Sequence, residues 1–182
     1  MSAQSNKVAI VTGASRGIGA AIAQRLARDG FAVAVNYAGD TKSAEALVKQ
    51  IEAAGGQAIA VKADVADASA VRALFDATEK AFGGVDVLVN NAGIMQLARI
   101  ADATDDQFDR QIAINIKGTF NGLREAGRRL RNGGRIINFS TSVVGTKLET
   151  YGVYTATKAA VESLTAIVSK EMRGRSITDV AA

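Results

Sequence analysis

The chain has 182 residues, 48% of them hydrophobic, and its 22 lysines and arginines against 18 aspartates and glutamates give a net charge of +4. This length and apolar content suit one domain with a large core. Because the chain has no Cys and no His, a disulfide, a thiol nucleophile and a Ser–His catalytic pair are excluded, and we expect no metal site.

The first half of the chain alternates apolar strands with helices. Strands are predicted over 7–12, 31–36, 57–62 and 85–90, and helices over 17–29, 41–54 and 68–82. Asp40 or Thr41 is expected to cap the second helix and Asp67 the third, and glycine pairs follow both helices.

The second half continues the alternation with longer helices. Helices are predicted over 104–130 and 151–172, a strand over 135–140, and a possible sixth strand over 176–180. Thr104 and Gln107 form a capping box at the start of the first of these helices, and residues 132–134 are expected to end it.

This alternation predicts an α/β fold. Near-continuous apolar strands indicate a sheet that is covered on both faces. Right-handed crossovers then give a doubly wound parallel sheet of the Rossmann type, in three αβα layers, ordered 3-2-1-4-5 with a possible sixth strand. No linker or repeat divides the chain, so we predict a single dinucleotide-binding domain over 1–182. Its ligand crevice is expected between strands one and four, at their carboxyl ends.

A glycine-rich turn joins the first strand to the first helix. Gly13 lets the chain turn sharply, Gly17 leaves no side chain between the backbone and a pyrophosphate, and Gly19 lets the helix lie close to the sheet. The pyrophosphate would meet free N–H groups and the positive end of the helix dipole. The spacing is GxxxGxG rather than GxGxxG, and alone it is also compatible with a simple turn.

Further candidate residues lie at the strand ends and on the last long helix. Small or polar residues end all five strands, at Thr12-Gly13, Asn36, Asp64-Val65, Asn90-Asn91-Ala92-Gly93 and Ser140-Thr141-Ser142. Tyr154 and Lys158 are four residues apart, so a helix places both on one face. An ammonium group near a phenol favours the phenolate, which would lower the pKa of Tyr154 toward neutrality. The alternative for this pair is ordinary amphipathic packing.

Together these segments resemble the short-chain dehydrogenase/reductase family. The resemblance covers residues 6–178, with the motifs in the family's order and spacing. It rests on Thr12-Gly13-Ala14-Ser15-Arg16-Gly17-Ile18-Gly19, Asp64-Val65, Asn90-Asn91-Ala92-Gly93, Asn115, and Ser142 with Tyr154-Thr155-Ala156-Thr157-Lys158.

The resemblance implies an oxidoreductase that reduces a ketone or 3-oxoacyl carbonyl, or oxidises the alcohol. Tyr154 would be the general acid, and Ser142 would orient the carbonyl oxygen. Lys158 would lower the pKa of Tyr154 and hold the nicotinamide ribose, and Asn115 would hold a water that links Lys158 to solvent.

The resemblance also implies a cofactor site. The residues expected to bind the cofactor are Gly13, Ser15, Arg16, Gly17, Ile18, Gly19, Asn36, Asp64, Val65, Asn91, Ala92, Gly93, Tyr154 and Lys158. An acidic residue at the end of strand two would repel a 2′-phosphate, but the sequence has Asn36 there. Arg16 can reach toward a phosphate, so we predict NADP(H) rather than NAD(H).

The resemblance is incomplete after the Tyr–Lys helix. Family members continue there with a substrate lid and a last strand, which we expect this chain to lack. The chain also has no proline, although average usage of about 5% predicts roughly nine. The alternative to a reductase is therefore a truncated or engineered dinucleotide-binding module with little turnover.

Partners and location are predicted from what the sequence lacks. The N-terminus has no apolar signal-peptide core and no run is long enough to span a membrane, so we expect a cytoplasmic protein without a membrane partner. Five arginines between 124 and 135 lack interleaved aromatics, which favours a solvated helix end over nucleic-acid binding. We expect a small carbonyl or alcohol substrate, and a possible homo-oligomer through the helices at 104–130 and 151–172.

Overall fold

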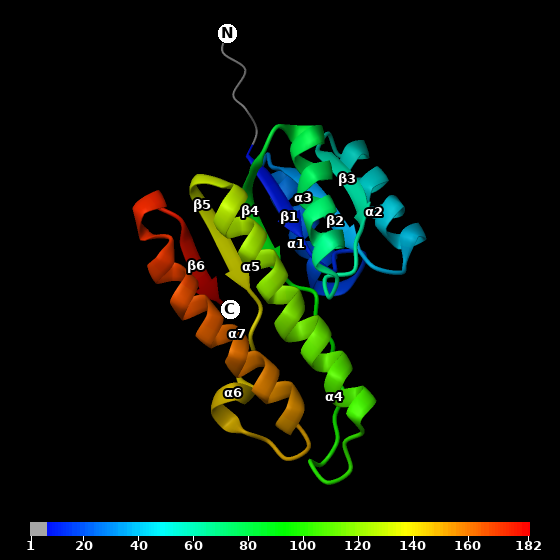
Figure 1. Cartoon of the computed structure of the whole chain (residues 1–182). Helices are drawn as coiled ribbons and strands as arrows, with labels where there is room; N and C mark the ends of the chain where they lie inside the picture. The colour runs from blue at the N-terminus through cyan, green and yellow to red at the C-terminus, as the bar shows by residue number, and fades with distance from the viewer. Residues whose placement is uncertain (1–6) are drawn as a thin grey trace.

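The computed structural model, which describes residues 7–182, contains one parallel sheet of six strands in the order β3-β2-β1-β4-β5-β6 (Figure 1). The strands are β1 (Val8–Val11), β2 (Ala32–Tyr37), β3 (Gln57–Lys62), β4 (Val85–Asn90), β5 (Leu130–Asn138) and β6 (Thr178–Ala181). In the register of the central strands, Ile10 lies opposite Ala34 on one side and Leu88 on the other. The predicted strand order and the sixth strand are confirmed.

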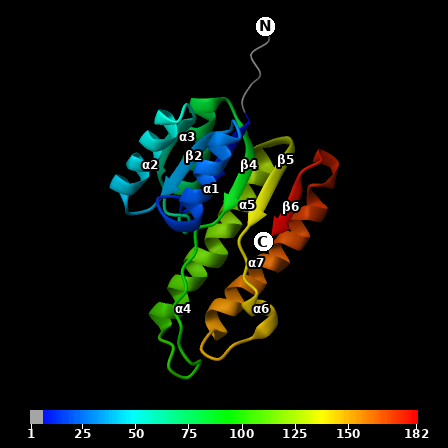
Figure 2. The same cartoon turned by 180° about the vertical axis from the view of Figure 1, so that it is seen from behind.

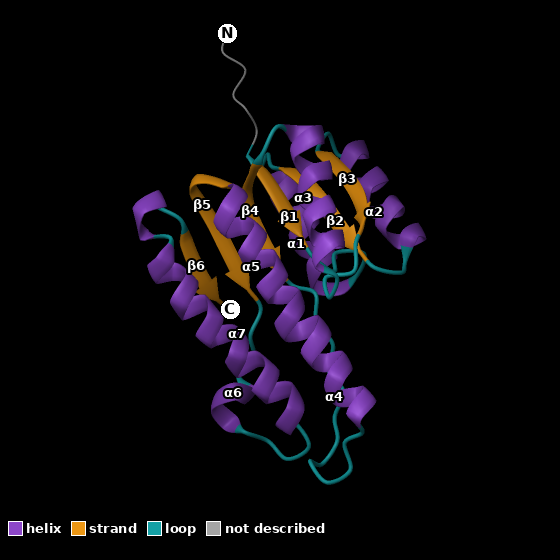
Figure 3. Ribbon diagram, in the orientation of Figure 1, coloured by secondary structure: helices purple, strands orange, loops and turns teal. Residues whose placement is uncertain are grey.

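Helices cover the sheet unequally. They are α1 (Gly17–Arg28), α2 (Thr41–Ala53), α3 (Ala68–Phe82), α4 (Asp105–Gln111), the π-helical η1 (Ile112–Lys117), α5 (Gly118–Arg129), α6 (Val143–Thr146), α7 (Gly152–Glu171) and the short 3-10 helix η2 (Arg173–Arg175). In Figures 1 and 3, α3, α5 and α7 lie on one face. Figure 2 shows α1 and α2 on the opposite face, over β1–β3, whereas β5 and β6 carry no described helix on that side.

Two apolar clusters lie on either side of the sheet. Ile10, Leu88 and Ile136 are fully buried and pack with α3 and α5. Val11 and Val33 face the other way and pack with α1 and α2. Since alternate residues of each central strand enter opposite clusters, nearly every position in these strands is apolar. No helix among residues 7–182 is long and apolar enough to cross a membrane.

The long helix predicted over 104–130 differs from prediction in its middle and at its end. The capping box of Thr104 and Gln107 is confirmed, but the helix widens to a π-helical segment at Ile112–Lys117 before α5 resumes. A π-helical turn holds an extra residue, and the spacing of apolar residues in the sequence does not reveal it. The helix ends at Arg129, close to the predicted Leu130, but the strand predicted over 135–140 was wrong at both ends, because β5 runs from Leu130 to Asn138 and includes residues 132–134 as an irregularity.

Several arginines between 124 and 135 are ion-paired rather than simply solvated. Arg129 is 18% exposed and bonds Glu79 of α3 at 2.6 Å. Arg131 pairs with Asp86 of β4 at 3.0 Å. Both ion pairs connect segments far apart in the sequence, so they tie α5 and β5 to their neighbours in the fold.

A chain of buried amides links the last three strands. Asn90 Nδ2 donates to Asn138 Oδ1 (2.8 Å), and Asn138 Nδ2 donates to Thr165 Oγ1 (2.9 Å) and Asp179 Oδ1 (2.8 Å). The other carboxylate oxygen of Asp179 is buried without a hydrogen-bond partner in the described part of the chain. Burial raises the pKa of Asp179 to about 7.

We expect Asp179→Asn to stabilise the protein above pH 7. The folded protein keeps this proton up to about pH 7, whereas the unfolded chain loses it near the ordinary value of 3.8. The wild type should therefore lose stability relative to the variant as the pH rises between these values. Because the side chain is partly exposed, we expect a gain of only about 1–2 kcal/mol at pH 8.

Urea unfolding at pH 5 and pH 8 measures this difference in the free energy of unfolding, with the exposed Asp102→Asn as the control. An Asp179→Asn variant whose advantage over the wild type does not grow between the two pH values contradicts the expectation.

Candidate active site

The glycine-rich turn brings the backbone of α1 against the end of β4. Gly13 and Gly17 have positive φ angles of 62° and 58°. A Cβ at Gly19 would lie 2.6 Å from both Asn91 Nδ2 and the Gly13 carbonyl oxygen, so only glycine fits there. α1 begins at Gly17 without a side-chain cap, which leaves its first N–H groups available to an anion.

Thr12 and Asn91 join β1 to β4 at the point where the strand order reverses. The Thr12 hydroxyl accepts from the backbone N–H groups of Asn91 and Ala92, both at 3.0 Å. Asn91 Nδ2 donates to the carbonyls of Thr12 (2.8 Å) and Gly13 (3.1 Å). Sequence reasoning placed Asn91 in the site but assigned no binding role to Thr12.

A trough of about 640 Å³ runs along this edge of the sheet. Its size is within the range of small-molecule and cofactor sites, about 300–1,000 Å³. Twelve of the residues predicted to bind the cofactor line it: Gly13, Ser15, Arg16, Gly17, Ile18, Gly19, Asn36, Asp64, Val65, Asn91, Ala92 and Gly93. The lining also includes Ile94 and Arg110, which sequence reasoning did not select.

The end of β2 differs from the prediction. The strand ends at Tyr37 rather than Asn36, and Asn36 is only 1% exposed. Its Oδ1 accepts from Gly13 N (3.2 Å), and its Nδ2 donates to the carbonyl of Ala63 (3.0 Å). Asn36 therefore holds the glycine turn against β3, and the residues that follow it form the rim of the trough.

Asp40 is an acidic residue in this rim. It caps α2 by accepting from Ser43 N (3.0 Å), as predicted, and it lines the trough with Arg16. The hydrogen bonds from Ser43, together with the charge of Arg16, lower the pKa of Asp40. A carboxylate is thus present near Arg16, although not at the end of β2.

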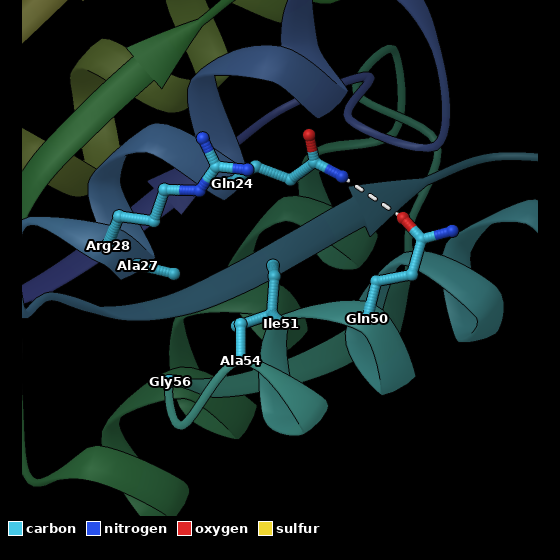
Figure 4. Close-up of a pocket in the computed structure, with 7 residues that line it drawn as sticks. All are labelled: Gln24, Ala27, Arg28, Gln50, Ile51, Ala54 and Gly56. Carbon is cyan, nitrogen blue, oxygen red and sulfur yellow. Dashed lines mark hydrogen bonds between the residues drawn. The ribbon is translucent and has the colours of Figure 1, made fainter.

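A second hollow, of about 240 Å³, lies between α1 and α2 (Figure 4). Gln24 Nε2 donates to Gln50 Oε1 (3.0 Å) across it, and the apolar side chains of Ala27, Ile51 and Ala54 line it. None of the predicted site residues contributes to this hollow. It is smaller than the trough and lies apart from the candidate catalytic residues.

Lys158 lies on α7 beside the far end of the trough. Its Nζ donates to the Phe139 carbonyl (2.7 Å) and is 5.9 Å from the centre of the Tyr154 ring. A Cβ on Gly93 would be 3.5 Å from the same nitrogen. Burial lowers the pKa of Lys158 below its ordinary value of 10.5.

Tyr154 does not have the lowered pKa that the sequence suggested. Burial of the phenol raises its pKa above the ordinary value of 10, and this outweighs a hydrogen bond with Thr141 that acts in the opposite direction. The predicted titration near neutrality also depends on the charge of a bound nicotinamide ring, so it stays a prediction for the protein with its cofactor. The ammonium of Lys158 bonds the Phe139 carbonyl instead of the phenol.

Two hydroxyl groups precede α6 and approach Tyr154 differently. Ser142 is the N-cap position of α6, and its carbonyl accepts from Gly145 N (3.0 Å). Thr141, immediately before it, acts to lower the pKa of Tyr154 against the effect of burial, and its hydroxyl accepts from Val143 N (3.3 Å). The sequence analysis named both residues as strand-end candidates but predicted a catalytic role only for Ser142, because residue spacing alone does not distinguish adjacent hydroxyls in a loop.

Asn115 lies in the π-helical segment and connects three parts of the site. Its Oδ1 accepts from Ile94 N (2.8 Å), and its Nδ2 donates to the Ile94 carbonyl (2.8 Å) and to Thr157 Oγ1 (3.0 Å). Both of its amide hydrogens are used by protein groups. Asn115 therefore fixes the segment after β4 against α7. The α7 residue that it bonds, Thr157, directly precedes Lys158.

The comparisons with known proteins agree with this arrangement. A profile of the short chain dehydrogenase family matches residues 7–182. The chain belongs to this family. It is 45% identical to an uncharacterised oxidoreductase of Methylorubrum extorquens over 97% of its length, and 43% identical to a 3-oxoacyl-[acyl-carrier-protein] reductase of Staphylococcus aureus over 94%. It covers 71% of each of these relatives.

A solved structure gives the same result for the fold. The crystal structure of a short chain dehydrogenase from Burkholderia cenocepacia in complex with NADP matches 96% of this chain with a TM-score of 0.92 and 41% identity. The match covers 72% of that chain. Across the curated relatives, this chain spans between 65% and 71% of their length.

Proposed function

We propose that this short-chain dehydrogenase is an NADP(H)-dependent oxidoreductase that reduces a ketone or 3-oxoacyl carbonyl, or oxidises the corresponding alcohol. The observation that carries the proposal is the continuity of the trough with the acid–base pair. The trough reaches Gly93, and Lys158 Nζ lies directly beside that residue, with Tyr154 next to it. The Staphylococcus relative, named as a 3-oxoacyl reductase, supports this substrate class.

The residues present fit a dinucleotide. The uncapped start of α1 and the open space above Gly17 suit a pyrophosphate, with Ser15, Ile18 and Gly19 around it. Asp64 and Val65 would hold the adenine, and Ala92 and Gly93 the nicotinamide end. When bound, such a cofactor supplies a hydride to the carbonyl carbon or accepts one from the alcohol.

The protonation states suit reduction. Burial raises the pKa of Tyr154, which favours the protonated phenol that donates a proton to a carbonyl oxygen. The nearby ammonium of Lys158 would stabilise the phenolate that forms. Ser142 and Thr141 are the hydroxyls that would orient the carbonyl oxygen, and Asn115 would hold Gly93 and Lys158 in their relative positions.

Arg16 supports NADP(H) as the cofactor. It lines the trough near the end of β2, and the strand ends in Tyr37 rather than a carboxylate. The carboxylate of Asp40 neutralises part of the charge of Arg16, so removing this carboxylate should strengthen binding of a 2′-phosphate. The Burkholderia neighbour in complex with NADP supports the same choice.

A fluorescence titration of NADPH and NADH into the purified chain tests the cofactor. We expect tighter binding of NADPH, and Arg16→Ala should weaken it by about 10–100-fold, the value of a charge-assisted hydrogen bond. Asp40→Asn keeps the helix cap and should strengthen NADPH binding. Equal or tighter NADH binding by the wild type contradicts the prediction.

A screen of ketones with bound NADPH tests the reaction. Consumption of NADPH that depends on a ketone supports an oxidoreductase. Saturable NADPH binding without turnover of any ketone or 3-oxoacyl thioester instead identifies a dinucleotide-binding module.

We also propose that two copies of the chain pair through α5 and α7. A groove of about 390 Å³ between these helices exposes Phe120 and Ile167, which are 44% and 50% exposed. Arg128 and Glu171 both line it, so a two-fold arrangement would bring opposite charges together. Sedimentation equilibrium measures the mass, and a monomer at all concentrations contradicts this assembly.

A further inference from the structure

The segment after β4 alternates strictly between packed and exposed residues. From Gly93 to Ala98, every second residue is exposed, and the others pack inward. Met95 and Leu97 are 53% and 42% exposed, so two large apolar side chains of one short segment face away from the core. Because alternate residues of an extended chain point to opposite sides, Met95 and Leu97 share one face.

Gln111 holds the inward side of this segment. It is 1% exposed, its Oε1 accepts from Gln96 N (3.2 Å), and its Nε2 donates to the Gln96 carbonyl (3.2 Å). Asn115 makes the equivalent pair of bonds with Ile94. The two amide side chains thus take the place of a neighbouring strand.

The two amides hold alternate residues of the segment. Gln111 bonds the backbone of residue 96 and Asn115 bonds the backbone of residue 94, so both bonded positions lie on the inward side. Because Gln111 Oε1 accepts a backbone N–H group, residue 96 must supply one, which a proline cannot do.

The exposed face of the segment begins at Gly93, where an added Cβ would lie 3.5 Å from Lys158 Nζ. Ala98 N donates to the Thr150 carbonyl (3.1 Å), which joins this segment to the loop between α6 and α7. In Figures 1 and 2 these two loops meet below the sheet, next to the start of α7. Leu148 of the second loop is also 53% exposed, so both loops contribute apolar side chains.

We propose that Gln111 is a positioning residue for substrate selection, in addition to the role that Asn115 has in the site. By fixing the backbone of Gln96, it keeps Met95 and Leu97 turned toward the reacting carbonyl group. The substituent that they would contact is apolar, because neither side chain offers a hydrogen bond. This inference rests on the proposed reductase function and adds a preference for ketones with alkyl or aryl chains.

Gln111→Met tests the inference, because methionine has a similar length and cannot make either hydrogen bond. Gln107→Met is the matched control, since it removes a glutamine side-chain bond to a backbone N–H group, that of Thr104, on the same helix. Four quantities are measured for both variants: amide hydrogen exchange in the peptide that covers 93–99, the dissociation constant of NADPH, and kcat and KM for 2-octanone and acetone.

In Gln111→Met we expect faster exchange in this peptide and a loss of about tenfold in the preference for 2-octanone, through a raised KM rather than a lowered kcat. The dissociation constant of NADPH should stay unchanged, which shows that the variant is folded. Gln107→Met should change neither the exchange nor the preference.

The outcomes that overturn the proposal are distinct. Unchanged exchange in Gln111→Met removes the structural role of the two hydrogen bonds. Faster exchange with an unchanged preference for 2-octanone removes the role in substrate selection but leaves the reductase function intact. A wild type that turns over no ketone contradicts the proposed function itself, and with it the selection.

Discussion

Tyr154→Phe is expected to lower turnover by about 10²–10⁴-fold, the usual contribution of a general acid. The substitution removes only the hydroxyl, and the ring can still pack against Tyr151, whose ring centre is 6.4 Å away. The dissociation constant of NADPH should therefore change little. Measurement of kcat and of NADPH binding for the same preparation separates the two effects.

Two further variants test the hydroxyls that precede α6. Thr141→Val and Ser142→Ala each remove one hydroxyl before α6. The variant that lowers kcat more identifies the hydroxyl that orients the carbonyl oxygen. If Tyr154→Phe keeps wild-type turnover, the assignment of Tyr154 as the acid is wrong.

The pH dependence of the reaction follows from the same residue. In the protein without ligands, burial raises the pKa of Tyr154 and so favours the protonated phenol. A bound cationic ring and the charge of Lys158 act in the opposite direction, toward a lower pKa.

Much of the fold could be predicted because each element carries its own local signal. β3, α3 and β4 begin and end at the predicted residues, since apolar runs, Asp67 and glycine pairs mark them. The trough also follows from sequence, because parallel strands bring their carboxyl ends to one edge. Gly13 and Asn91 are far apart in the chain, yet both line it.

The rest depends on contacts that only the folded chain makes. Burial sets the pKa of Tyr154, and no spacing of residues reports the burial of one phenol. Asn36 lies one residue before the end of β2, and its side chain bonds Gly13 and β3. Gln111 gave no signal, because a glutamine in a helix is ordinary until its partner segment is known.

Gly19→Ala is expected to weaken NADPH binding by more than tenfold and to destabilise the fold by about 1–3 kcal/mol, as overpacking of a tight contact does. The added methyl group would lie 2.6 Å from the Gly13 carbonyl oxygen and 2.9 Å from Ala14 Cα, and both are backbone atoms. α1 would then have to move away from the turn that forms the proposed phosphate site.

Gly17→Ala and Gly174→Ala complete the comparison. A Cβ on Gly17 meets no protein atom within 4 Å, but the residue has a positive φ angle and lines the trough. Gly17→Ala should therefore weaken NADPH binding and lower the free energy of unfolding by only about 1 kcal/mol. Gly174 has open space and lies outside the trough, so its alanine variant should change neither quantity. If all three variants bind NADPH equally well, the phosphates do not lie on this turn.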